Sequence, residues 1–513
     1  MKKIFLYGVA IATAASMLAS CIGDLDTQPL DNKIKTADKA FADPDSYSQY
    51  VNYAYSYFSL VSQSDPGTSD IAVDNAGQSE FPRQYMVLNE MSTDALKCIW
   101  GDDYVDGIQY NKWTTTNAAI LAVYLRGLKG VAICNQFLDA SVSSDGAVSG
   151  RGHSSKLEEV RHYRAEMRML RAFYYEILLD LFGNPPVALP ENIGSTNFPK
   201  QLGREGLFNW IESELTALIE GDDLPAVRVA YPRMSKGAAW AVLARMYLNA
   251  EIYTGKPRWE DARNAAEKCI SDGGYELCQN YWNLFRQDNS TNGAQNEFII
   301  AALYDSKLTP SWGGTTTLIY SAINSDMREP ISALYGFDSD IYVNQWNGYH
   351  VSDEFVMENF DLQGVEWGAK EGFGYNRELS DRRAAFYNIG FKQKFNNDVS
   401  EITSGWACIK WLPITSDNRA ICKEENIENS SADFAFFRLA EMYLISAEAE
   451  ARINGGTLNS SNNGYRRIQS LRERANGPGD VMPATIDLDY ILKERVRELM
   501  WEGHRRTDLI RYG

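Results

Sequence analysis

The sequence predicts a mainly α-helical protein, with one domain built as a helical scaffold around a large, irregular, loop-rich region. The first observation is that apolar residues recur at three- and four-residue spacing through most of the chain, which is typical of amphipathic helices. The second is that this periodicity fades in residues 280–423, where glycine, asparagine, tryptophan and tyrosine accumulate. So long an irregular stretch is uncommon in a compact chain unless it has a function, and we expect ligand contacts there.

The amino terminus has the pattern of a lipoprotein signal peptide. Lys2 and Lys3 precede an apolar run, residues 4–18, that is too short to span a bilayer, and Leu-Ala-Ser leads into Cys21. This pattern predicts removal of residues 1–20, lipidation of Cys21, and a mature protein that is anchored to a membrane rather than spanning it. An ordinary cleavage site with a chance cysteine is the alternative.

Helical periodicity predicts six helices in the first part of the chain. They cover residues 36–62, 117–140, 156–182, 204–220, 235–253 and 259–271, whereas residues 64–84 are predicted to form a loop. Two prolines, Pro185 and Pro186, end the third helix because proline cannot continue it. The last two of these helices resemble one tetratricopeptide pair, with small alanines where helices approach closely.

Three further helical segments close the chain. They cover residues 434–452, 463–475 and 494–511. Charged side chains in these segments lie at helical spacing from opposite partners, as in Arg438 with Glu441 and Glu502 with Arg505 and Arg506. We expect structural ion pairs of the kind found on exposed helices, worth ~0.3–0.5 kcal/mol each.

Composition limits the kinds of ligand. The 513 residues are 44% hydrophobic, enough for a large core, and the net charge is −18. That charge excludes a nucleic-acid-binding surface, which needs clustered Lys and Arg, and it suits neutral or cationic ligands. Disulfide bonds could form among six cysteines, but the sequence spacing of these cysteines does not reveal which would pair. The six are Cys98, Cys134, Cys269, Cys278, Cys408 and Cys422.

The three closing segments, in this order, resemble the carboxyl-terminal cassette of the SusD/RagB family of outer-membrane nutrient-binding lipoproteins. The helix over residues 156–182, with the turn after it, resembles the signature helix of the same family. The resemblance implies one domain over residues 21–513, on a scaffold of tetratricopeptide-like helix pairs, with further residues after Gly513. It also implies an outer-membrane, cell-surface protein, anchored at Cys21, that passes an oligosaccharide or polysaccharide to a TonB-dependent, SusC-like transporter.

Aromatic residues in irregular segments are the candidates for glycan contacts, because sugars present flat C–H faces and rows of hydroxyls. Three glycine- or amide-rich segments hold a tryptophan with polar neighbours. Matching to a starch-binding member of the family implies sugar contacts by Arg83, Trp100, Asp103, Trp312 and Trp346, and we add Asn347 as a hydrogen-bonding residue. A starch-like α-glucan is therefore one expected ligand. That assignment stays open, because Cys98 stands where the relative has a further tryptophan.

The same resemblance places Asp288 and Asp433 at acidic positions of a calcium site, although Ser431 stands where an acid is expected. No other cofactor is implied. Two alternatives to glycan capture are a protein-binding scaffold or adhesin and a glycoside hydrolase, for which neighbours such as Asp102 and Asp103 could supply paired carboxylates. Since the chain has no nucleophile elbow, phosphate-binding loop or metal-ligand motif, we expect a protein that is not an enzyme.

Overall fold

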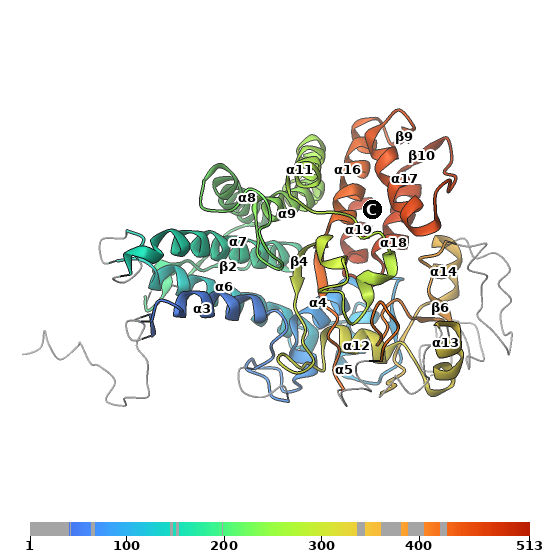
Figure 1. The fold of residues 1–513 in the computed structure, drawn as a ribbon, viewed down its shortest axis with the longest axis horizontal. Helices are drawn as coiled ribbons and strands as arrows, with labels where there is room; N and C mark the ends of the chain where they lie inside the picture. The colour runs from blue at the N-terminus through green and yellow to red at the C-terminus, as the bar shows by residue number, and fades with distance from the viewer. Residues whose placement is uncertain are drawn as a thin grey trace, which may run out of the picture.

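The computed structural model describes ten stretches of the chain. They are residues 40–41, 43–62, 67–143, 147–149, 153–196, 198–335, 344–360, 381–387, 405–420 and 428–513. The predicted signal peptide, Cys21 and Cys422 lie outside them. Most of the described residues are helical, and Figure 1 shows a stack of helices on one side with α4, α5, α12 and α13 on the other.

The helical stack follows chain order. The bounds of its helices are α6 (Ala118–Ala140), α7 (Leu157–Phe182), α8 (Arg204–Glu220), α9 (Lys236–Leu248), α11 (Trp259–Asp272), α16 (Leu439–Ile453), α17 (Asn463–Asn476) and α18 (Leu488–Leu499). Each of these packs against the next as far as α17, and α18 packs against α16. Small residues permit this closeness, as Gly130 of α6 shows, because a Cβ there would lie 2.2 Å from the Tyr174 ring of α7. The predicted helical scaffold is confirmed.

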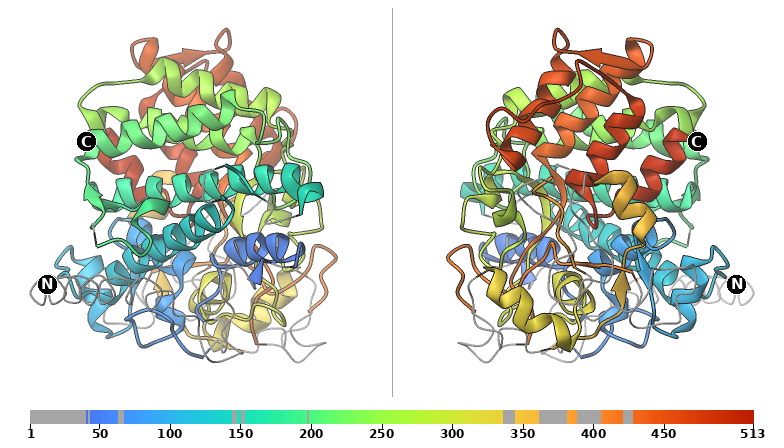
Figure 2. Two further views of the ribbon diagram at one scale, coloured as in Figure 1. Left: turned by 90° about the vertical axis from the view of Figure 1, so that its left-hand side faces the viewer. Right: turned by 90° about the vertical axis from the view of Figure 1, so that its right-hand side faces the viewer.

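Shorter helices and five small antiparallel sheets complete the described structure. The remaining α-helices are α3 (Ser46–Ser56), α4 (Phe81–Glu90), α5 (Asp103–Gln109), α10 (Ala250–Thr254), α12 (Gly314–Ser321), α13 (Arg328–Tyr335), α14 (Asp353–Asn359) and α19 (Arg505–Tyr512). The strand pairs are β1 (Lys97–Cys98) with β5 (Tyr349–His350), β2 (Pro186–Val187) with β3 (Lys200–Gln201), β4 (Phe298–Ala302) with β8 (Phe434–Arg438), β6 (Phe386–Tyr387) with β7 (Ala407–Cys408), and β9 (Thr457–Asn459) with β10 (Thr485–Asp487). Figure 2 shows the β9–β10 pair at one end and the yellow helices α12 and α13 at the other.

Helix α6 is the one described helix that is long and apolar enough to cross a bilayer by length and composition. It packs against α4 and α7 inside the protein. Its Arg126 is fully buried and donates to Asp70 at 2.5 Å and to the Ser79 carbonyl at 2.8 Å. We therefore interpret α6 as a core helix.

Four predicted helices have different boundaries. The helix predicted over 36–62 is α3, only Ser46–Ser56 among the described residues, and the helix predicted over 235–253 is divided at Asn249 into α9 and α10. The segment predicted as one helix from residue 434 begins as strand β8, whose five residues are all buried, and a fully buried strand cannot be told from a buried helix by periodicity. The segment predicted over 494–511 is two helices, α18 and α19. Trp501 and Gly503, with φ of 60° and 86°, take the left-handed conformation between them. The predicted loop 64–84 is also too long, since α4 begins at Phe81.

The ion pairs expected within the closing helices have other partners. Arg438 pairs with Glu297, Glu498 and Glu502 at 2.9, 2.5 and 2.6 Å. Arg505 pairs with Asp94 and Arg506 with Asp180. This arrangement agrees with the prediction that these charges are structural. The predicted partners were wrong, because Arg438 and its carboxylates are not exposed on one helix. They are buried where β8, β4 and α18 meet.

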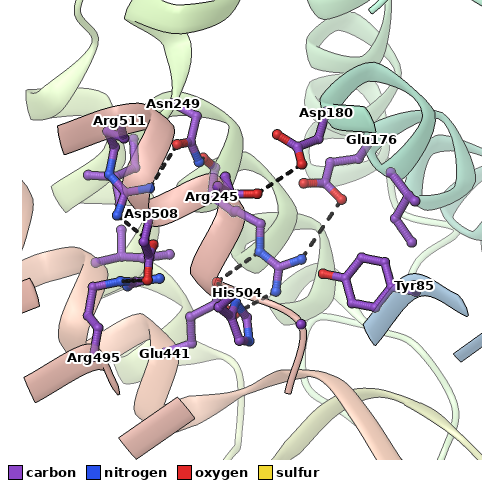
Figure 3. Close-up of a pocket in the computed structure, with 15 residues that line it drawn as sticks. Tyr85, Glu176, Asp180, Arg245, Asn249, Glu441, Arg495, His504, Asp508 and Arg511 are labelled. Atoms are coloured by element: carbon purple, nitrogen blue, oxygen red, sulfur yellow. Dashed lines mark hydrogen bonds and ion pairs between the residues drawn. The ribbon is translucent and has the colours of Figure 1, made fainter. Parts of the chain in front are cut away.

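A second buried charge cluster joins α7, α9, α16, α18 and α19 (Figure 3). Arg245 donates to Glu441 at 2.8 and 2.7 Å, and Arg495 donates to Asp508 at 2.8 Å. The cavity between them is about 20 Å³, which has room for a water molecule and none for a sugar. The described cysteines are also structural: Cys98, Cys134, Cys269, Cys278 and Cys408 are buried, and all are free thiols.

Candidate functional site

The tryptophans singled out in the sequence surround one open hollow of about 700 Å³, which we call the aromatic hollow. Its lining residues are Gly67, Asp74, Asn75, Ala76, Gly77, Arg83, Trp100, Trp312 and Trp346. Each tryptophan is partly exposed, so part of every indole is accessible to a ligand. Arg83, Trp100, Trp312 and Trp346, all predicted as contacts, are thus brought together from distant parts of the chain.

Two of the three indole rings are direct neighbours, and a hydrogen bond connects the third to the same segment. The centroids of Trp312 and Trp346 lie 6.2 Å apart with their planes inclined by 40°. The Trp100 indole N–H donates to the Trp346 carbonyl at 3.4 Å, which ties the third ring to the other two. The guanidinium carbon of Arg83 lies 6.0 Å from the centroid of the Trp100 ring. Stacking surfaces and a donor-rich cation therefore share one wall.

Backbone hydrogen bonds hold the Trp346 segment against the end of α12. Three consecutive amides donate to α12 or to the residues that follow it: Trp346 to Tyr320 at 2.8 Å, Asn347 to Ile323 at 3.1 Å and Gly348 to Ser321 at 2.7 Å. On the other side the Ile99 amide donates to the Gly348 carbonyl at 3.0 Å, beside the β1–β5 pair. A Cβ at Gly348 would lie 2.1 Å from the Trp100 ring, so only glycine allows this close approach.

The Trp312 segment is held by Glu80, the N-cap of α4. The buried Glu80 carboxylate accepts from the amides of Arg83 at 2.6 Å and Gly314 at 3.0 Å, and from the Tyr304 hydroxyl. Burial raises the pKa of Glu80 to about 7, although these hydrogen bonds lower it. One carboxyl thus joins α4, which carries Arg83, to the start of α12, which follows Trp312.

The glycines after Trp312 make this contact sterically feasible. A Cβ at Gly313 would lie 2.5 Å from the Glu80 Cβ, and Gly314 has φ of +47° with the Tyr304 hydroxyl 2.0 Å from where a Cβ would be. The two glycines therefore let the chain pass close to α4.

Asp74 and Asn75 line the aromatic hollow and were not predicted. Their segment is held by Arg126, which donates to the carbonyls of Val61 at 2.7 Å and Ser79 at 2.8 Å. In the sequence, the one feature that pointed to Asp74 and Asn75 is their position in the same predicted loop as Arg83. Polar residues are so common in loops that this position alone does not identify a ligand contact.

Asp103 and Asn347 lie elsewhere. Asp103, the first residue of α5, is exposed and lines a neighbouring hollow instead. Asn347 has φ of 41°, and its side-chain oxygen lies 3.1 Å from Nε2 of His350. Neither is a lining residue of the aromatic hollow, so their predicted sugar contacts stay predictions.

The chain is similar to known proteins both in sequence and in fold. Residues 343–513 match the model of the SusD family. The starch-binding protein SusD of Bacteroides thetaiotaomicron is 28% identical over 546 aligned residues, which cover 100% of this chain and 90% of that protein. Residues 343–513 thus carry the pattern of the SusD family, and the whole chain is similar to a SusD protein.

Solved structures of SusD proteins have the same fold. A SusD homologue from Bacteroides thetaiotaomicron superposes with a TM-score of 0.65 at 19% identity, covering 93% of this chain and 87% of the other. Surface glycan-binding protein A from the same organism, in complex with laminarihexaose, has a TM-score of 0.62 at 19% identity, covering 91% and 90%. The predicted fold, with its SusD-type helical scaffold, is confirmed.

The calcium ligands expected from the SusD resemblance do not form one set in the described residues. The Asp433 carboxylate accepts from the Tyr231 hydroxyl at 2.7 Å and the Tyr304 amide at 2.8 Å. The Asp288 carboxylate accepts from the hydroxyl and amide of Ser416 at 2.6 and 2.9 Å. Burial raises the pKa of Asp433 to about 7, although its hydrogen bonds with Tyr231 and Tyr304 lower it. No group of three or more acidic, histidine or cysteine ligands occurs among the described residues, and the calcium site stays a prediction.

Proposed function

We propose that this protein binds a glycan at the aromatic hollow without cleaving it, stacking sugar faces on Trp100, Trp312 and Trp346. The observation that carries the proposal is that three partly exposed indoles and Arg83 meet at one open hollow. Indoles offer large apolar faces that match the C–H faces of sugars. A contiguous apolar patch rimmed by polar residues is typical of a ligand-binding site.

Polar groups in the hollow complete the recognition of a sugar. Arg83 supplies donors, and Asp74 and Asn75 supply acceptors, for hydroxyls at the ring edges. The hollow is open, so a bound sugar stays partly solvated and we expect modest affinity. Asp74 is the one carboxylate among its described lining residues, so these residues do not supply the two opposed carboxylates that glycoside hydrolysis needs.

The finer assignment is an α-glucan of the starch type, captured at the cell surface and passed to a SusC-like, TonB-dependent transporter. Support for starch comes from the 28% identity to a starch-binding relative, and the 40° inclination between Trp312 and Trp346 suits a chain whose successive sugars turn. A structural relative binds laminarihexaose, so a β-glucan is the first competitor. The surface location depends on the signal-peptide pattern that ends at Cys21.

Calorimetry of the mature protein against maltooligosaccharides, laminarihexaose, fructan fragments and xylan fragments tests this proposal. The double variant Trp312→Ala, Trp346→Ala should lose binding of the glycan class that the wild type takes. Phe198→Ala is the matched control, since Phe198 is a 92% exposed aromatic residue outside the hollow, and it should bind like the wild type. Absence of binding to every glycan would favour the scaffold alternative, and release of shorter products on long incubation would favour a hydrolase.

A further inference from the structure

A second hollow of about 760 Å³, which we call the α5 hollow, adjoins the aromatic hollow. Its lining residues are Gln78, Asp102, Asp103, Tyr104, Asp106, Gly107, Tyr110, Lys112, Trp113, Thr114, Thr116, Asn117 and Ala118. The two hollows have neighbouring walls: Gly77 lines the first and Gln78 the second, and Asp102 is two residues after Trp100. Since consecutive Cα atoms are about 3.8 Å apart, one extended ligand could contact both.

Two exposed aromatic residues line the α5 hollow. Tyr110 is 43% exposed and Trp113 is 50% exposed, and among the described aromatic residues only Phe198 is exposed to a comparable or greater extent. Both follow the end of α5, in a turn where Asn111 has φ of 54° and the Lys112 amide donates to the Gly107 carbonyl at 2.8 Å. Large aromatic surface left in water contributes nothing to the core, so its concentration in one hollow indicates a ligand platform.

The platform stands on ordered structure. The Asn117 side chain donates to the Tyr104 carbonyl at 3.1 Å, and its oxygen accepts from the Ala119 amide at 3.0 Å at the start of α6. A Cβ at Gly107 would lie 2.7 Å from the same Asn117 side chain, so α5 and the start of α6 are in close contact. The turn that carries Tyr110 and Trp113 is therefore fixed at both ends by helices.

Most of the charged residues that line the α5 hollow are acidic. Asp102 and Asp103 are exposed on its rim, and Asp106 accepts from Gln109 at 3.1 Å. Lys112 is the one basic residue among the described lining residues, and its Nζ lies 5.6 Å from the centroid of the Tyr110 ring. Carboxylates accept hydrogen bonds from sugar hydroxyls but repel uronate and sulfate groups.

We propose that the α5 hollow is a second subsite for the same glycan chain, in which Tyr110 and Trp113 stack sugars beyond those held by Trp100, Trp312 and Trp346. The proposal rests on the function proposed above and adds a substrate class. The ligand is a neutral glycan long enough to reach both hollows, and acidic glycans are rejected.

A chain-length series tests this inference. Calorimetry would compare maltotriose with maltoheptaose, and laminaritriose with laminarihexaose, on the wild type and on the double variant Tyr110→Ala, Trp113→Ala. The long members should bind the wild type more tightly, and the double variant should weaken their binding about tenfold while leaving the trisaccharides unchanged. Phe198→Ala is again the control, and thermal unfolding of each variant checks that it is folded.

Each outcome separates this inference from the function on which it rests. If Trp312→Ala with Trp346→Ala removes binding but Tyr110→Ala with Trp113→Ala leaves the chain-length dependence unchanged, the second subsite is wrong and the aromatic hollow stands. If no member of either series binds the wild type, both proposals are wrong for glucans and the second subsite is withdrawn. Binding of hexagalacturonate as tight as that of the neutral hexamer would overturn the charge selection.

Discussion

At the scale of single residues, Glu80 shows how one buried carboxyl can organise a surface site. It accepts hydrogen bonds from the Arg83 and Gly314 amides and from the Tyr304 hydroxyl, and thereby joins the two segments that bring Arg83 and Trp312 to the aromatic hollow. The same burial that makes these bonds strong penalises the charged form of Glu80.

Glu80 therefore gives stability a pH dependence that can be measured. Its pKa is about 7 in the folded protein and 4.5 ordinarily, so the folded state binds a proton more tightly. Its contribution to the free energy of unfolding should rise as pH falls from 7 to 4.5, by up to about 3 kcal/mol. Glu80→Gln keeps an oxygen for the two amides and should flatten this part of the profile in urea unfolding. A variant with the wild-type slope would contradict the assignment.

Gly348 offers a second prediction at this scale. An added methyl group would collide with the Trp100 ring, so Gly348→Ala should lower the free energy of unfolding by about 1–3 kcal/mol and weaken glycan binding by displacing that ring. Gly101→Ala is the matched control. Gly101 is next to Trp100 but has nothing within 4 Å of an added Cβ, so its effect should stay within about 0.5 kcal/mol. Equal effects of the two substitutions in calorimetry and urea unfolding would refute the argument.

At the scale of elements, the segment over residues 67–79 depends on a neighbouring helix for its shape. Apart from the short 3-10 turn Gly77–Ser79 it has no regular structure, yet it places Asp74 and Asn75 in the aromatic hollow. Buried Arg126 of α6 supplies the missing hydrogen bonds by donating to Val61, Asp70 and Ser79. A core helix thus determines the conformation of a surface loop.

Replacing Arg126 should release this segment. Arg126→Met leaves the buried carbonyls and Asp70 without their main donor, and we expect a loss of about 3–5 kcal/mol in the free energy of unfolding. Lys129→Met is the control, because Lys129 pairs with the same Asp70 from a side chain that is 36% exposed, and it should cost under about 1 kcal/mol. Hydrogen exchange should accelerate in residues 67–79 of the Arg126 variant alone. Unchanged exchange there would show that the segment holds its shape by itself.

At the scale of the whole molecule, buried ion pairs connect elements that are far apart in the chain. Arg438 of β8 meets Glu297 beside β4, Glu498 of α18 and Glu502 after it, and Arg383 also reaches Glu498 at 3.0 Å. Arg474, Arg438 and Arg383 hold the pKa of Glu498 well below its usual range, against the effect of burial. Arg383 likewise lowers the pKa of Asp381 to about 2, also against burial.

Two classes of buried carboxyl give the protein a stability maximum in mildly acidic solution. Burial raises the pKa of Glu90 to about 7 and of Glu176 to about 8, and such groups stabilise the fold as pH falls from 8 toward 4.5. Glu498 and Asp381 have lowered pKa values, so their contribution is lost as pH falls below their ordinary values of 4.5 and 3.8. His504, whose pKa is lowered to about 4, offsets part of the gain below pH 6.5 because it stays neutral when folded.

We expect the free energy of unfolding to be largest at about pH 5 and to fall steeply in more acidic solution. Urea unfolding from pH 3 to pH 9 measures it. Arg438→Met removes the positive charge that Glu498 and Glu502 share, and should lower stability at pH 7 by about 3–5 kcal/mol with a shallower acid limb. A free energy of unfolding that increases steadily from pH 5 to pH 8 would contradict the raised pKa values of Glu90 and Glu176.

Local pattern was sufficient for most of the fold. Helices α6, α7, α8, α11 and α17 begin and end within a few residues of the predicted limits, because an amphipathic stripe and its stop signals belong to one short segment. Strand β8 escaped prediction because it is buried on both faces and has no alternation to reveal it. The partners of Arg438 escaped because charge spacing along a helix says nothing about side chains that face the core.

The sequence by itself determined that this is a mainly helical protein that resembles the SusD family and has tryptophans in irregular segments, because helix periodicity, glycine-rich turns and family motifs are carried by consecutive residues. Only the tertiary structure decided that Trp100, Trp312 and Trp346 meet Arg83, Asp74 and Asn75 at one hollow, and that Asp103 lies with Tyr110 and Trp113 in the next. The physical reason is that these groupings depend on hydrogen bonds and close packing between residues hundreds of positions apart, as from Glu80 to Gly314 or Gly348 to Trp100.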